Sequence, residues 1–103
     1  MLRIVNLNDC KLEKNEILIR VDRESVLGNP FRMENYSVSE RNRVCNEYNK
    51  YFLKKVREEG EFRTEVIKIY SLVKQGYKVA LGCHCAPKRC HAEMIVAFVE
   101  SYL

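Results

Sequence analysis

Several features that would place a protein in a special class are missing from this sequence. No stretch approaches the ~20 consecutive apolar residues of a membrane-spanning helix. The first ten residues, MLRIVNLNDC, have neither the apolar core nor the small-residue cleavage site of a secretory signal peptide. Internal repeats, low-complexity tracts and linkers are absent as well. We therefore expect a single domain over residues 1–103 with no membrane partner, in the cytoplasm, or in the host cytoplasm for a viral source.

The cysteines do not form the pattern of a secreted, disulfide-bonded protein. There are five, an odd number, and no two of them make a Cys-x-x-Cys pair. Thiols stay reduced inside cells, which agrees with a cytoplasmic protein. The charged share of 31% and the net charge of +4 are ordinary for a globular chain. This mild basic excess is compatible with a nucleotide or nucleic-acid partner but does not require one.

Hydrophobic periodicity predicts three strands and three helices in the order β-β-α-α-β-α. Alternating or continuous apolar residues predict strands over 2–7, 16–22 and 77–83. Ser37 followed by Glu40 matches a helix capping box, and glycines at 60 and 76 mark two helix ends. The expected helices are 37–59, 62–75 and 87–102, the last with Pro87 in its first turn. The sequence thus predicts a small α/β domain with a short, Rossmann-like sheet of about three strands packed by three helices.

One segment, GCHCAPKRCH at 82–91, holds three of the five cysteines and both histidines. It joins the last predicted strand to the last predicted helix, and ligands of open α/β sheets usually bind at the carboxyl ends of strands. The N-terminus of a helix attracts anions, and Lys88 and Arg89 add positive charge beside it. The segment is therefore a candidate anion-binding site.

The same surroundings favour a reactive thiol. Positive charge and a helix N-terminus lower the pKa of a nearby cysteine, so Cys90 or Cys85 is a candidate nucleophile. His84 or His91 can serve as a base, an acid or an orienting group. We take Cys90 and His91 as the catalytic candidates, because both fall at the predicted start of the helix.

A zinc site is a second interpretation of this segment. Thiolate and imidazole are preferred zinc ligands, and Cys83, Cys85, Cys90 and His91 can supply a Cys₃His set from one loop. Against this, no distant half-site is present, and adjacent residues on a helix diverge by ~100°. In a third interpretation the cysteines and histidines simply pack in the interior.

A second candidate segment, SVLGNPF at 25–31, follows the second predicted strand. Gly28 allows a ligand to approach the backbone closely, and the following proline biases Asn29 to an extended conformation that projects its amide. A structural turn explains the segment equally well. We expect this loop and segment 82–91 to meet across one crevice. The predicted ligand-binding residues are Arg20, Arg23, Gly28, Asn29, Lys88 and Arg89.

Together the two motifs resemble a known family. IRVDRESVLGNPF at 19–31, RVCNEYNKYF at 43–52 and LGCHCAPKRCHAE at 81–93 resemble the domain-of-unknown-function family 4326, small proteins of bacteria and bacteriophages. The C-terminal motif is also similar to that of another uncharacterised, Rossmann-like family. His84 stands where the family usually has an aromatic residue, and Glu93 where aspartate is frequent. The resemblance implies no activity, but it implies a site made of Asn29, Cys83, Cys85, Cys90, His91 and Glu93.

Three functions are compatible with these patterns. The first is an intracellular domain that binds a nucleotide-like or other anionic metabolite, either as a binding module or as an enzyme that acts on it. The second is a zinc-binding structural or interaction module that contacts nucleic acid or a host protein. A structural or assembly protein without any site is a third.

Overall fold

The chain folds into the predicted elements in the predicted order β-β-α-α-β-α, in a computed structural model that describes residues 1–103. The strands are β1 (Leu2–Asn6), β2 (Glu16–Arg20) and β3 (Lys78–Cys83). The helices are α1 (Val38–Arg57), α2 (Glu61–Lys74) and α3 (Ala92–Glu100), and a short 3₁₀ turn η1 (Leu7–Asp9) follows β1. The predicted α/β fold is confirmed.

The sheet is parallel throughout, with β3 between β1 and β2. The central place of β3 explains its nearly continuous apolar sequence, because a strand paired on both sides and covered by helices is shielded from water. The register sets Arg20 of β2 opposite Gly82 of β3. Since parallel strands end at the same edge of a sheet, the segments that follow β2 and β3 leave the sheet side by side.

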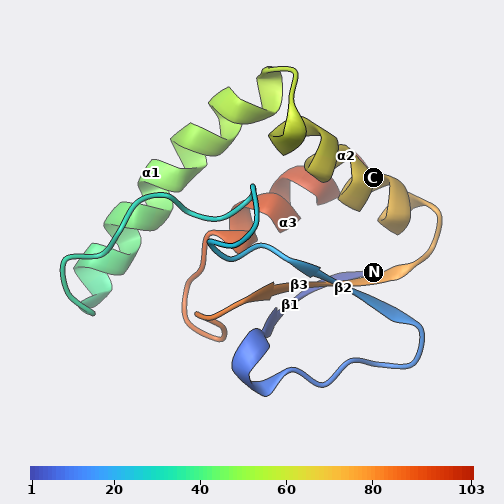
Figure 1. Cartoon of the computed structure of the whole chain (residues 1–103), viewed down its shortest axis with the longest axis horizontal. Coiled ribbons are helices and arrows are strands. Elements are labelled where there is room, and N and C mark those ends of the chain that lie inside the picture. The colour runs from blue at the N-terminus through green and yellow to red at the C-terminus, as the bar shows by residue number, and fades with distance from the viewer.

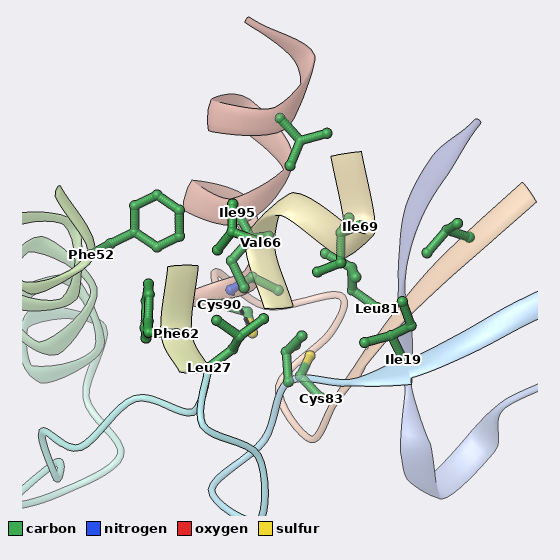
Figure 2. Close-up of a cluster of buried hydrophobic side chains, with 14 of the residues drawn as sticks. Ile19, Leu27, Phe52, Phe62, Val66, Ile69, Leu81, Cys83, Cys90 and Ile95 are labelled. Atoms are coloured by element: carbon green, nitrogen blue, oxygen red, sulfur yellow. Dashed lines mark hydrogen bonds between the residues drawn. The ribbon is translucent and has the colours of Figure 1, made fainter. Parts of the chain in front are cut away.

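The three helices lie on one side of the sheet, and the segment around η1 lies on the other (Figure 1). Phe52 of α1, Phe62 of α2 and Ile95 of α3 belong to one buried cluster that also includes β-strand residues (Figure 2). Each such side chain contributes about 1.5–3 kcal/mol when it leaves water. None of the helices combines the length and the apolar character needed to cross a membrane.

Local signals set the helix boundaries largely as predicted. The Ser37 hydroxyl accepts a hydrogen bond from the Glu40 amide at 3.1 Å, as expected of a capping box. Gly76 has a φ of 96°, which favours glycine at the end of α2. These contacts confirm the predicted start of α1 and the predicted end of α2.

The last helix begins later than the sequence predicts. α3 starts at Ala92, and the residues from His84 to Cys90 form an irregular loop instead of the first helical turns. The Lys88 amide donates to the Cys85 carbonyl at 2.9 Å and closes a turn around Pro87. Proline is favoured both in tight turns and at helix starts. The sequence signal predicts a helix start at Pro87, but this residue lies in a turn.

Candidate functional site

The two predicted segments meet at a cavity of about 330 Å³ beyond the carboxyl ends of β2 and β3. Its walls come from the loop after β2, the first turns of α1 and the loop before α3. Figure 1 shows these three stretches converging beside the sheet. The predicted site residues in its lining are Arg20, Arg23, Asn29, Cys85, Arg89, Cys90 and His91.

Four predicted site residues do not line the cavity, and one of them, Glu93, is exposed at the start of α3. Lys88 is exposed on the loop before α3, and Cys83 is fully buried at the end of β3. Gly28 packs against its own chain, since a Cβ there would lie 2.4 Å from the carbonyl oxygen of Asp22. The close approach that the glycine permits is therefore to backbone of the same loop, and not to a ligand.

Asp22 and His84 form a pair at the cavity that sequence reasoning missed. Asp22 is only 6% exposed, and its Oδ2 lies 3.0 Å from His84 Nε2. Arg20 also binds this carboxylate and pairs with Glu24 at 3.0 Å. The Arg20 guanidinium, and secondarily His84, hold the pKa of Asp22 below its ordinary value. The pair follows from the strand register, because extending the β2–β3 pairing by two residues sets Asp22 opposite His84. Sequence reasoning could have found it only by assuming that β2 and β3 are neighbours.

Arg23, Arg41 and Arg89 line the cavity without a carboxylate partner. No carboxylate oxygen lies within 4.0 Å of their guanidinium nitrogens. Each is held instead by neutral oxygens. These acceptors are the carbonyls of Asn29 and Phe31 for Arg23 (3.2 and 3.3 Å), the carbonyl of Arg89 for Arg41 (3.2 Å), and the amide side chains of Asn42 and Asn46 for Arg89 (3.0 and 2.9 Å).

Asn29 lines the cavity, but both polar atoms of its side chain are already used inside the protein. Its Nδ2 donates to the Val44 carbonyl at 3.2 Å, and its Oδ1 accepts from the Phe31 amide at 2.9 Å. The residue is only 8% exposed. The geometry gives Asn29 a positioning role, which ties the loop after β2 to α1, and leaves only the second N–H of Nδ2 for a further partner.

His91 and Cys90 are buried at the inner end of the cavity. His91 Nε2 is hydrogen-bonded to the carbonyl of Val21, so Nε2 is the donor and Nδ1 is left as an acceptor, 3.6 Å from Cys90 Sγ. Burial lowers the pKa of His91. Hydrogen bonds to the sulfurs of Cys83 and Cys85, together with burial, raise the pKa of the Cys90 thiol. Cys90 is therefore a proton donor within the thiol cluster, which disfavours it as the thiol that first attacks a ligand or an oxidant.

Cys85 fits the role of nucleophile better than Cys90. It is partly exposed and lines the cavity. A hydrogen bond from Cys90, followed by contact with the Arg41 guanidinium, lowers the pKa of Cys85. A thiol carries one proton, so Cys90 can donate to only one neighbouring sulfur at a time. The positive charge of Arg41 favours Cys85 as the acceptor, since it stabilises a thiolate there.

The amide groups at the start of α3 do not form the predicted anion site. The Cys90 amide donates to the Glu93 carboxylate at 3.1 Å, and the Ala92 amide donates to Cys90 Sγ at 3.5 Å. The next two amides, of Glu93 and Met94, donate to backbone carbonyls. Because these four amides already have partners, the positive charge in the cavity comes mainly from arginine side chains.

The zinc interpretation required Cys83, Cys85, Cys90 and His91 as ligands. The Cys90 thiol hydrogen-bonds to the sulfurs of Cys83 and Cys85, but His91 uses Nε2 in a hydrogen bond to the backbone. No group of three or more histidine, cysteine, aspartate or glutamate side chains has an arrangement suited to a metal ion. Zinc binding stays an alternative prediction, which elemental analysis can test.

The fold and the cavity define a class, a small parallel α/β domain with an arginine-lined pocket beside a cysteine-histidine loop. Residues 5–101 match the model of the family described as "Domain of unknown function (DUF4326)". The chain belongs to this family, which confirms the resemblance seen in the sequence. No curated protein and no solved structure is detectably similar to the chain.

Proposed function

We propose that this domain binds a small anionic metabolite, nucleotide-like in size and chemistry, in the cavity between the GNPF loop and the cysteine-histidine loop. The observation that carries the proposal is the set of three arginines, Arg23, Arg41 and Arg89, that surround the cavity without a carboxylate partner. A guanidinium held only by neutral oxygens keeps its charge for an external anion. Its fork of donors also suits phosphate and carboxylate oxygens.

The size of the cavity narrows the class of ligand. At about 330 Å³ it lies at the small end of the usual range for ligand pockets, ~300–1,000 Å³. This favours a mononucleotide or a smaller anion over a dinucleotide. Phe31, Met33 and Val44 contribute apolar surface to the same wall. They give a base or another ring a place to pack beside the arginines.

If the domain acts on its ligand, the groups available in the cavity are Cys85, Asp22 and His84. Cys85 would attack the ligand, because its sulfur lies at the wall beside Arg41. His84 would transfer the proton, with Asp22 orienting its ring through the 3.0 Å contact. Cys90 would hydrogen-bond to the sulfur of Cys85, and His91 would contact Cys90 in the interior.

A thermal-shift panel tests the binding proposal. The panel contains inorganic phosphate, nucleosides, nucleoside mono-, di- and triphosphates, and sugar phosphates. A specific ligand at 100 times its Kd stabilises the protein by about 2.7 kcal/mol. For a domain of this size that raises Tm by about 10–20 °C. Stabilisation by phosphorylated compounds but not by nucleosides would support the proposal, and no response to any anion in the panel would contradict it.

The zinc-binding alternative has its own test. Elemental analysis of purified protein should find about one zinc per chain, and chelation should remove the metal together with the fold. Metal-free protein that stays folded would contradict the alternative and leave the anion proposal in place.

A further inference from the structure

Three of the five cysteines, Cys83, Cys85 and Cys90, form a cluster that anion binding does not require. Cys85 and Cys90 line the same cavity, Cys83 and Cys90 belong to one buried cluster against which Cys85 packs, and the Cys90 thiol hydrogen-bonds to both other sulfurs. Figure 2 shows Cys83 and Cys90 in the same buried cluster. Cys45 lines the same cavity but has no hydrogen bond to these sulfurs, Cys10 lies outside the cavity, and all five thiols are free. The cluster is therefore a local feature of the loop before α3.

The three thiols differ sharply in their access to solvent. Cys83 is 0% exposed and lies outside the cavity, and Cys90 is only 3% exposed at its inner end. Cys85 is partly exposed and faces the cavity. A small reagent that enters the cavity therefore meets Cys85 first. Cys90 is in contact with it from behind and is shielded from the reagent.

We propose that Cys85 and Cys90 form a reversible redox pair, in which Cys85 is the thiol oxidised from the cavity and Cys90 closes the disulfide. The two residues are five positions apart on an irregular loop, so joining them costs little loop-closure entropy. Inside cells, disulfides of this kind are transient and serve sensing or catalysis. The proposal goes beyond the binding function and does not depend on it.

The chemistry balances with a hydroperoxide as the oxidant. Cys85 Sγ attacks a peroxide oxygen, an S–O bond forms and the O–O bond breaks. The departing oxygen takes the thiol proton, so sulfur is oxidised to the sulfenic acid while hydrogen peroxide is reduced to water. Cys90 Sγ then attacks Cys85 Sγ, an S–S bond forms, and the S–O bond breaks with loss of water. His91 Nδ1, 3.6 Å from Cys90 Sγ, is positioned to take the Cys90 proton during this step.

Peptide mapping by mass spectrometry tests the pair in the full-length protein. After limited treatment with hydrogen peroxide, wild-type protein should lose two of its five free thiols and contain one intramolecular Cys85–Cys90 disulfide, and dithiothreitol should restore all five. Cys10→Ser removes an isolated thiol outside the cavity and should leave this disulfide unchanged. In Cys90→Ser, or in Cys90→Ala if the first variant folds poorly, Cys85 should accumulate as a sulfenic acid that dimedone traps.

Three results would overturn the proposal. One is a disulfide that joins other cysteines, such as Cys85 to Cys45. Another is oxidation of Cys10 ahead of Cys85. The third is stepwise overoxidation of Cys85 in wild-type protein with no disulfide. None of these readouts uses a nucleotide or another anion, so failure of the redox pair is distinguishable from failure of ligand binding.

Discussion

The two sides of the cavity hold their arginines in different ways. At the end of β2, Arg20 is paired with Asp22 and with Glu24, so its charge is compensated within the protein. Across the cavity, Arg41 and Arg89 have no carboxylate partner and hydrogen-bond to carbonyl and amide oxygens, and Arg41 also contacts the sulfur of Cys85. The positive charge of an arginine is thus neutralised by carboxylates on one side of the cavity. On the other side no carboxylate competes with an external anion.

The difference has a physical basis. A charge that is partly removed from water without a counter-ion costs free energy, and proteins usually offset this cost by pairing it. Arg41 and Arg89 are half-buried, so two such costs accumulate around one cavity, and the exposed Arg23 adds a third guanidinium without a carboxylate partner. A bound anion would offset the cost at Arg41 and Arg89 and could reach Arg23 from the loop after β2, which is why these three arginines form the binding set in our proposal.

The largest effect is expected from Arg41→Ala on the unpaired side. Hydrogen bonds to charged groups contribute about 1.5–3 kcal/mol, so affinity for the stabilising anion should fall about 10–100-fold by calorimetry. Arg43→Ala is the matched control. Arg43 lies two residues after Arg41 on α1, but it is ion-paired with Glu40 and Glu47. Equal losses of affinity in the two variants would remove the distinction between paired and unpaired arginines.

Asn29→Ala should lower stability while its effect on the ligand is indirect. The change leaves the buried Val44 carbonyl and the Phe31 amide without their partner. We expect a loss of about 2 kcal/mol in the free energy of unfolding, measured by urea titration. Asn49→Ala, on the half-buried surface of α1, should cost much less. If Asn29→Ala abolishes binding at unchanged stability, then Asn29 contacts the ligand directly.

Asp22→Asn tests the paired side through its pH dependence. Folding lowers the pKa of Asp22, so the carboxylate is favoured in the native state. This stabilisation is fully present above the ordinary aspartate pKa of about 4, and it is lost as the pH falls through the lower native pKa. The variant should be about 1 kcal/mol less stable at pH 7 and should lose less stability than wild type on going below pH 4. Parallel stability–pH curves would show that the Arg20–Asp22–His84 network does not form.

The smallest effect is expected from Asn46→Ala. Asn46 only orients Arg89, which keeps its second hydrogen bond to Asn42. Arg89 keeps its charge and is only less well oriented, so the effect should be smaller than the loss of a bond made directly to the anion, about threefold to tenfold in affinity, with little change in Tm. A loss as large as that of Arg41→Ala would mean that the amide itself contacts the ligand.

The sequence predicted the elements well because each has a local signal. Ser37 and Glu40 predict the start of α1, and Gly76 predicts the end of α2. The apolar run before Cys83 predicts β3. The start of α3 was misplaced because Pro87 suits a turn as well as a helix. The order of the strands depends on how the helices cross over the sheet, and no local signal encodes it.

For the site, the sequence identified the two loops but not all of their partners. Cys90 and His91 were rightly placed beside the GNPF loop, yet their burial, which changes the role of Cys90, is a tertiary property. Arg41 lies on a helix whose rotation about its axis the spacing of charged residues does not fix. The pair of Asp22 and His84 becomes predictable only when β2 and β3 are known to be adjacent.

The most direct test of the anion pocket is an NMR titration that follows the side-chain Nε–Hε signals of the arginines. The stabilising phosphorylated compound, or inorganic phosphate if none stands out, is added stepwise to labelled protein. Saturable shifts of Arg23, Arg41 and Arg89, with Arg43 unchanged, are the predicted result. Unchanged signals from these three, or shifts spread equally over surface arginines, would contradict a pocket built from unpaired guanidinium groups.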